Sequence, residues 1–344
     1  MPHAQPSGDL PTLRQVAEAA GVSIKTASRA LNDEVHVASQ TSQRVKDAAA
    51  ALGYRRNLLA RDLRSHSSSN VVGMVIADAA NPFYSGIALA AAKILSERGL
   101  LLFLGFSDED ADMESRIVDG FLERRVAGLL VISSRRSHPQ LSSASSQGLP
   151  MVFLDRPARD LEVDEVLFDN IGGARAGIDH LLAQGHRRIG VIGDSGALPT
   201  HRERITGVRR AFSEAHVSID EDLFITDASD ADGAEAAMRT LLALPSPPTA
   251  VFTTNNRMAV GALRACDEAP APCALLTFDD LELAGVLGVS VVSNSPQDMG
   301  EHGARMLLER IDGHAGPRRR VRLRASLKVH RSTAIPLPER ESGS

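Results

Sequence analysis

A pair of short helical patterns joined at a glycine constrains this chain more than any other feature. The first pattern starts at Thr12, and Gln15 stands three residues later, which is the spacing of a capping box. Gly21 ends it, because glycine adopts the left-handed conformation at low cost. Ser23 can cap the second pattern, Ile24–Leu31. Two helices joined by a tight glycine turn predict a helix-turn-helix, whose second helix enters the major groove of DNA.

The second pattern has two different faces. Ala27, Ala30 and Leu31 form its apolar side. This division favours a DNA-reading helix, with a helical hairpin inside an ordinary core as the alternative. The opposite face carries the candidates for DNA contact: Ile24, Lys25, Ser28 and Arg29.

A third helical pattern follows at once. Ser39 is its expected N-cap and Gly53 its expected end. Three helices in about 45 residues make a domain near the lower size limit for independent folding. The residues at helical spacing along this pattern are Thr41, Val45, Ala48, Ala49 and Leu52.

Charge separates the N-terminal part from the remainder of the 344 residues. Residues 1–65 hold nine Lys/Arg and six Asp/Glu, a net charge of +3, whereas the remaining residues carry a net charge of −8. A basic module on an acidic body is the balance expected of a DNA-binding head joined to a domain with another task.

The ends of the chain and its cysteines limit the compartment. The N-terminal segment MPHAQPSGDLP has no apolar run, so no secretory signal is expected, and no stretch reaches the roughly 18 apolar residues of a membrane span. Cys266 and Cys273 are the only cysteines, and they predict neither a disulfide framework nor a zinc site. We therefore expect a soluble, cytoplasmic protein with no metal, no cofactor and no membrane partner.

From Val71 onward, short apolar runs alternate with helical stretches. Such runs predict buried parallel strands, and the alternation predicts an α/β fold. It restarts after Asp169, so we expect two similar α/β halves. The expected strands are VVGMVIA, LLLFLGF, AGLLVIS, PMVFLD and EVLFD in the first half, and RIGVIG, LFITD, AVFTT and ALLTF in the second. The expected helices are 85–98, 113–125, 172–184, 202–215, 232–243 and 256–268.

Three runs together resemble the lactose-repressor (LacI/GalR) family of bacterial transcription regulators. They are TLRQVAEAAGVSIKTASRALN, HVASQTSQRVKDAAAALGY and RRNLLARDLRS, and the resemblance continues to about Thr333. It implies an all-α helix-turn-helix head followed by a two-lobed effector domain of the periplasmic-binding-protein type, with Rossmann-like lobes built on parallel sheets. It also implies a nucleoid-associated homodimer that binds a palindromic operator and is controlled by a small-molecule effector.

The resemblance divides the chain as follows. A disordered segment at 1–10 precedes the head at 11–56, and a hinge helix with its linker occupies 57–70. The effector and dimerisation domain spans 71–336, and a tail covers 337–344. In the family the chain crosses back near its end, so the first lobe takes about 71–168 and 298–325, and the second about 169–295 and 326–336. The short, polar tail favours a dimer over a tetramer.

The resemblance also extends the set of DNA contacts. Leu63 matches the family leucine that wedges between base steps in the minor groove, an apolar insertion that kinks the duplex; a leucine packed on the effector domain is the alternative. The full set of expected DNA contacts is Thr12, Ser23, Ile24, Lys25, Thr26, Ser28, Arg29, Asn32, His36, Thr41, Tyr54, Asn57, Ala60 and Leu63.

Polar residues follow the expected strands, where ligands of open α/β sheets bind. In the family, several of these positions line the effector cleft, and a cationic fork with an amide and a carboxylate suits hydroxyl-rich or carboxylated molecules. Arg204 is the leading candidate to hold two ligand oxygens, with a surface helix position as the alternative. The expected effector residues are Phe83, Tyr84, Asp155, Arg204, Asn255 and Asp279. Departures from the family pattern, which weaken a simple hexose assignment, are Asn256, Thr277 and Ala228.

Other classes of protein fit the sequence less well. It contains no GxxxxGK[ST], HExxH or GxSxG motif, so no catalytic residues are expected. A solute-uptake binding protein would share the two-lobed architecture but not the head, and a sugar-modifying enzyme would need Asp155 or Asp279 as a base. We therefore expect a transcription regulator that acts as a repressor, with an effector that either releases DNA or promotes its binding.

Overall fold

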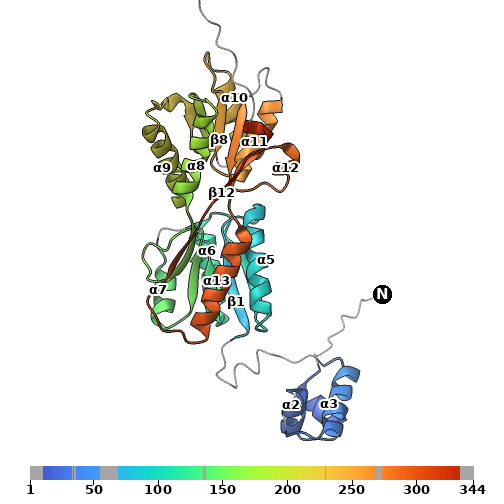
Figure 1. Cartoon of the computed structure of the whole chain (residues 1–344). Coiled ribbons are helices and arrows are strands. Elements are labelled where there is room, and N and C mark those ends of the chain that lie inside the picture. The colour runs from blue at the N-terminus through green and yellow to red at the C-terminus, as the bar shows by residue number, and fades with distance from the viewer. Residues whose placement is uncertain are drawn as a thin grey trace, which may run out of the picture. The chain divides into compact units, whose positions relative to one another are not determined.

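The computed structural model describes residues 11–32, 34, 36–54, 69–134, 137–228, 230–267 and 273–333. The chain divides after Ser68 into two compact units. The smaller unit consists of helices, and the larger one is an α/β unit of two lobes (Figure 1). Both expected fold classes are therefore present.

The small unit contains three helices, α1 (Leu13–Ala19), α2 (Ile24–Leu31) and α3 (Ser39–Ala51). The expected capping box closes α1, since Thr12 N donates to Gln15 Oε1 at 2.8 Å and Gln15 N donates to Thr12 Oγ1 at 3.4 Å. Ser23 Oγ accepts from Thr26 N at 3.1 Å at the start of α2. Gly21 takes the left-handed conformation between the two helices, with φ +64°. Small buried side chains let the three helices pack closely: Val16, Ala17, Ala20, Ala27, Ala30, Val45 and Ala49.

The expected cap of α3 was wrong by one position. Ala38 is the N-cap, with φ −56° and ψ 138°, and Ser39 is already helical. No side chain caps this end, because alanine has no acceptor to offer the first amides.

The first lobe is built on a parallel six-stranded sheet with the order β11-β5-β4-β3-β1-β2. Helices α5 and α13 cover one face, and α6 and α7 cover the other. The strands are β1 (Val71–Ile76), β2 (Leu101–Phe106), β3 (Gly128–Val131), β4 (Met151–Leu154), β5 (Asp164–Phe168) and β11 (Arg320–Leu323). The helices are α5 (Pro82–Ser96), α6 (Ala111–Glu123), α7 (Pro139–Ser146) and α13 (Pro296–Ile311).

The second lobe has a sheet of the same size with the order β12-β10-β9-β8-β6-β7, in which β12 alone is antiparallel to its neighbour. Helices α8 and α9 pack on one face, and α10 and α11 on the other. The strands are β6 (Ile189–Ile192), β7 (Phe224–Ile225), β8 (Ala250–Thr253), β9 (Ala274–Phe278), β10 (Ser290–Ser293) and β12 (Ser326–Lys328). The helices are α8 (Asn170–Ala183), α9 (Pro199–Glu214), α10 (Ala231–Leu242), α11 (Asn256–Asp267) and α12 (Ala284–Leu287), with 3₁₀ turns η1 (Glu221–Leu223) and η2 (Arg331–Thr333).

Three crossings join the lobes. The chain leaves the first lobe after β5, returns to it between β10 and α13, and leaves it again between β11 and β12. Because β11 and β12 are separated by only Arg324 and Ala325, one short segment adds an edge strand to each sheet. The two lobes are therefore joined by three connections of the main chain.

Several helices begin earlier than their hydrophobic periodicity indicated. Helix α5 starts at Pro82 rather than Ser85, because Asn81 caps it and proline fits the first helical position. Asp110 caps α6 in the same way, and Pro199 opens α9. Two short helices and a strand were not anticipated from the periodicity, namely α7, α12 and β10.

Glycines bring paired helices into backbone contact. A Cβ at Gly261 would overlap with Ala231 O, which lies across the interface between α11 and α10. A Cβ at Gly207 would likewise overlap with Ile171 O between α9 and α8. A Cβ at Gly300 would overlap with Ile87 O between α13 and α5. Three of the four helix pairs that cover the sheets thus depend on positions that admit no side chain.

Gly261→Ala should lower the free energy of unfolding by at least about 1–3 kcal/mol, because the backbone atoms it meets cannot move aside as a side chain could. Urea unfolding of the full-length chain, followed by far-UV circular dichroism, measures the loss. Gly120→Ala on α6 is the control, since its nearest neighbour is the flexible end of Arg124 at 3.3 Å. It should change stability by no more than about 1 kcal/mol. Equal stability of the two variants would contradict the packing role.

Candidate functional site

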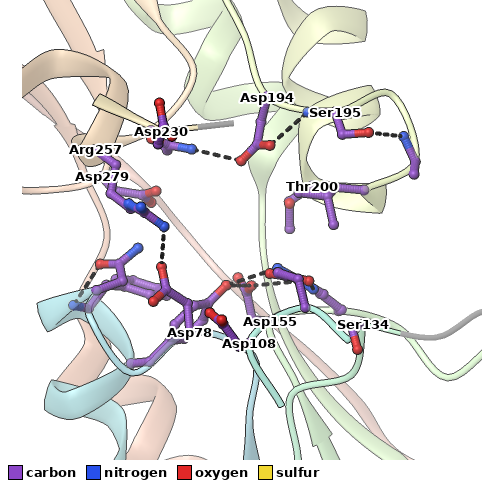
Figure 2. Close-up of a pocket in the computed structure, with 18 of the residues that line it drawn as sticks. Asp78, Asp108, Ser134, Asp155, Asp194, Ser195, Thr200, Asp230, Arg257 and Asp279 are labelled. Carbon is purple, nitrogen blue, oxygen red and sulfur yellow. Dashed lines mark hydrogen bonds and ion pairs between the residues drawn. The ribbon is translucent and has the colours of Figure 1, made fainter. Parts of the chain in front are cut away.

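A cavity of about 600 Å³ lies between the lobes and is lined from both of them. It sits where strand ends meet helix starts, as expected for a ligand of an open α/β sheet. All six expected effector residues line it: Phe83, Tyr84, Asp155, Arg204, Asn255 and Asp279. Figure 2 shows side chains of the two lobes facing each other across the gap.

The cavity contains further polar residues that were not assigned to it from the sequence. Seven of the eleven stand two or three residues after the end of a strand, so a search of every strand end for polar residues would have found those seven. They are Asp78, Asn81, Asp108, Glu109, Ser134, Arg156, Asp194, Ser195, Thr200, Asp230 and Arg257.

Arg204 is committed to a partner inside its own lobe. It comes from α9, and its Nη1 and Nη2 donate to Asp279 Oδ2 and Oδ1 at 2.9 and 3.2 Å. Its Nε donates to Asn170 Oδ1 at 2.9 Å, and Nη1 also donates to Thr254 O at 2.6 Å. Burial raises the pKa of Asp279, against the lowering effect of the Arg204 charge. The guanidinium therefore forms part of the cavity wall, and both of its Nη atoms already donate to the Asp279 carboxylate.

A second set of interacting charged residues lies at the end of β4. Arg156 donates to Glu109 with both ends of its fork, from Nη1 at 2.7 Å and from Nη2 at 2.5 Å. Asp155 stands beside it with φ +63°, a left-handed conformation that is uncommon for a side-chain-bearing residue. Burial raises the pKa of Asp155 to about 6, although Arg156 lowers it. Tyr84 supplies a long hydrogen bond, from its hydroxyl to Asp155 Oδ2 at 3.4 Å.

Two side-chain contacts bridge the lobes directly. Arg257 Nη1, at the start of α11 in the second lobe, donates to Asp78 Oδ2 in the first lobe at 2.7 Å. Asn256 Nδ2 donates to Asn81 Oδ1 at 3.0 Å, and this same oxygen caps α5 by accepting from Phe83 N. We refer to these two contacts as the interlobe latch. Through Asn81 the latch connects α11 to the first turn of α5.

The departures from the family pattern have three different environments. Asn256 belongs to the interlobe latch. Thr277 is buried in β9, where its hydroxyl donates to Asn255 O at 3.0 Å. Ala228 is buried in the apolar core of the second lobe and does not line the cavity. No aromatic side chain of the second lobe lines the cavity among the described residues, so a ligand ring has no stacking platform there.

A serine, a histidine and an aspartate form a row beside the cavity. Ser133 Oγ lies 2.8 Å from His138 Nε2, and His138 Nδ1 lies 2.8 Å from Asp160 Oδ1. Ser133 Oγ donates its hydrogen to Glu114 Oε1 at 2.8 Å. Burial alone would raise the pKa of Asp160, but hydrogen bonds from His138 outweigh this effect and lower the pKa to about 2. Because the serine hydrogen is held by a carboxylate and the hydroxyl is buried, this row fixes α6 and α7 and does not supply a nucleophile.

The head presents part of the expected DNA-contact set on its surface. Ser23, Ile24 and Lys25 are exposed at the N-terminal end of α2. Thr12, Asn32 and His36 are exposed, whereas Thr26, Ser28, Arg29, Thr41 and Tyr54 are half-buried. Asn57, Ala60 and Leu63 lie outside the described residues.

Two of the half-buried residues have local roles. Arg29 Nε donates to Glu34 Oε2 at 2.9 Å, so its charge is partly neutralised within the head. Tyr54 packs against the core of the three helices. Lys25, in contrast, makes no hydrogen bond or ion pair with another residue in the described part of the chain. Within the described residues, Lys25 is therefore an unpaired cation at the N-terminal end of α2.

The fold and the cavity define a two-lobed ligand-binding domain joined to a helix-turn-helix head. The family model for bacterial regulatory proteins of the lacI family matches residues 12–57, and a periplasmic-binding-protein-like model matches residues 178–333. The transcriptional regulator CelR of Thermobifida fusca is 33% identical over 336 residues, covering 94% of this chain and 98% of CelR. The ribose operon repressor of Escherichia coli K12 is 30% identical over 307 residues, covering 87% and 93%. The solved structure of the CelR–cellobiose complex superposes with a TM-score of 0.70 at 31% identity, covering 94% and 99%.

This chain belongs to the lacI family of bacterial regulatory proteins. It is a DNA-binding transcriptional repressor controlled by a small-molecule effector, and not an enzyme. Within the part that the structure describes, no helix is both long enough and apolar enough to span a membrane.

Arg204→Met should cost about 3–5 kcal/mol of stability, because it leaves the Asp279 carboxylate buried without its counter-charge. Adding Asp279→Asn should recover much of the loss, since asparagine tolerates the positive φ of 64° at this position. Thermal and urea unfolding of both variants measure the difference. If Arg204→Met alone stayed within about 1 kcal/mol of the natural chain, the buried pair would not be what supports this wall.

Proposed function

We propose that this repressor binds a palindromic operator as a homodimer, with one head on each half-site, and that a small polar effector binds in the interlobe cavity. The observation that carries the proposal is the cavity itself, because residues of both lobes line it and the latch joins the lobes beside it. A ligand that contacts both lobes differently in two arrangements shifts the equilibrium between them.

An apolar surface across both lobes supports the homodimer. In the first lobe, Leu89 of α5 is 75% exposed, and edge strand β2 is exposed along its length. In the second lobe, Val286 of α12 is 76% exposed. Helices α5 and α12 line one shared pocket, so these parts are adjacent. Exposed apolar patches of this extent mark protein–protein interfaces. The large exposed side chains on this surface are Leu89, Leu101, Phe103, Leu104, Phe106, Leu283, Val286 and Leu287.

This placement gives a route from effector to operator. Helix α5 bears part of the apolar surface, and its N-cap Asn81 accepts a hydrogen bond from Asn256 of the other lobe. A change in the angle between the lobes therefore changes how α5 of one subunit meets its counterpart in the other. The distance between the hinge segments (57–70) of the two subunits changes with it, and operator affinity shifts by a coupling free energy of typically about 1–3 kcal/mol.

The exposed N-terminal end of α2 supports its place in the major groove. We propose Lys25 as a base-reading residue, with Ser23 and Ile24 beside it, while the other exposed side chains of the head contact phosphates. Phosphate contacts set affinity and base contacts set sequence. Leu63 of the connector is proposed to enter the minor groove at the operator centre, where it would kink the duplex.

Lys25→Ala should change the half-site sequence that the full-length protein selects from a random operator library, because a specific base contact contributes about 1–3 kcal/mol of discrimination. The sequence selected by the natural chain should be palindromic. Arg14→Ala is the matched control, since it removes one exposed positive charge from α1, outside the reading helix. It should reduce affinity without changing the consensus. An unchanged consensus for Lys25→Ala, or a single half-site without symmetry, would count against the proposal.

A further inference from the structure

The arginines of the cavity are all engaged by carboxylates of the protein. Arg156 pairs with Glu109, Arg204 with Asp279, and Arg257 with Asp78. No lysine or histidine lines the cavity in the described part of the chain. A phosphate or carboxylate group on a ligand would therefore find no positive charge that is free to receive it.

Four more carboxylates line the same cavity, and none of them has an arginine fork of its own. Asp108 and Asp155 come from the first lobe, and Asp194 and Asp230 from the second (Figure 2). Asp194 accepts from Asn255 Nδ2 and from Ser195 N, and Asp230 caps α10. These are neutral donors, so they leave the charges in place.

The deepest of these carboxylates has an unused oxygen. Asp155 is 4% exposed, and its Oδ1 has no hydrogen-bond donor among the described residues. Its nearest cation, Arg156 Nε, lies 3.9 Å from Oδ2, beyond a hydrogen bond. Arg156 Nε is itself buried without an acceptor in the described part of the chain. Two neighbouring residues thus each keep one buried polar atom without a partner, which is costly unless a ligand supplies it.

We infer that the effector is a hydroxyl-bearing compound with a positively charged nitrogen, of the amino sugar class, and that Asp155 is the counter-ion of that nitrogen. The inference rests on the proposed function, because it names the ligand of the same cavity. An ammonium group can donate to the Asp155 carboxylate and neutralise it, whereas a hydroxyl group can donate but leaves the charge. A neighbouring ligand hydroxyl accepts from Arg156 Nε.

The same charges explain how such a ligand would close the lobes. Carboxylates from opposite lobes repel each other across the gap, and this repulsion is strengthened where water is excluded. A cation placed between them attracts both sides at once. A neutral ligand of the same shape lacks this electrostatic attraction to both lobes, so it would favour the closed arrangement less strongly.

Matched sugars test the inference. Calorimetry with the full-length protein compares glucosamine, galactosamine and mannosamine with their N-acetylated and 2-hydroxyl counterparts and with glucosamine 6-phosphate. At least one amino sugar should bind ten-fold or more tightly than both of its neutral counterparts, and the phosphate should weaken binding. The preference should decrease as ionic strength rises. If a neutral or phosphorylated member binds as tightly, or if no amino sugar binds, the inference is overturned.

Two substitutions distinguish a specific role of Asp155 as counter-ion from the effect of removing any one negative charge from the first lobe. Asp155→Asn should remove at least nine-tenths of the preference for the charged nitrogen, and asparagine tolerates the positive φ. Asp119→Asn, on the exposed side of α6, removes one carboxylate of the same lobe away from the cavity and should leave the preference unchanged. Retention of the preference in Asp155→Asn would assign the nitrogen to another residue.

Operator binding is measured on the same preparations with the selected palindrome. If the natural chain binds the operator and responds to a neutral sugar, the ligand class inferred here is wrong while the proposed function stands. If the protein selects no palindromic operator at all, the proposed function itself fails, whatever the sugars do.

Discussion

Two side chains at the start of α11 form hydrogen bonds directly from the second lobe to the first. Asn256 and Arg257 reach Asn81 and Asp78 of the first lobe at 3.0 and 2.7 Å. Three connections of the main chain join the lobes as well, and the two side-chain contacts add a direct link between them. The pair of contacts therefore sets how the two sheets present their strand ends to each other, and with them the shape of the cavity.

The buried charges of the cavity fix the walls on either side of this junction. Arg204 and Asp279 form a closed pair inside the second lobe, and Arg156 and Glu109 form another inside the first. Each pair is formed within one lobe, so it strengthens that lobe without restraining the other. The uncompensated carboxylates, in contrast, face the gap from both sides. On the inference drawn above, a positive charge placed between the lobes would attract both of them.

Local signals in the sequence predicted much of this arrangement. Thr12, Gln15, Gly21 and Ser23 specify the helix-turn-helix by capping and turn chemistry within a few residues. Alternating apolar runs predicted the two sheets, because a buried parallel strand must be apolar on both faces. The family resemblance, together with the position of polar residues at strand ends, selected six residues that do line the cavity. Each of these features is determined by residues close together in the sequence or by the position of a residue at the end of a strand.

Other features depend on pairings between distant positions. The partner of Arg204 is 75 residues away, so nothing near it in the chain indicates that its fork is occupied. The exposure of β2 follows from its place at the edge of the sheet, although its sequence is as apolar as that of a central strand. The contact at Gly261 requires knowledge of which helix packs beside it. Short segments such as α12 carry too few residues for a periodic pattern.

The claim that the angle between the lobes controls DNA binding is tested most directly by breaking the latch without touching the head. Asn256→Ala combined with Arg257→Ala removes both contacts, and Arg264→Ala, which breaks an ion pair with Asp232 inside the second lobe, is the control. Operator affinity of the full-length protein, measured by fluorescence anisotropy without effector, should change about 5- to 150-fold in the double variant. Its affinity for non-specific DNA should stay constant. An operator affinity within two-fold of the natural chain would contradict control through the interlobe angle.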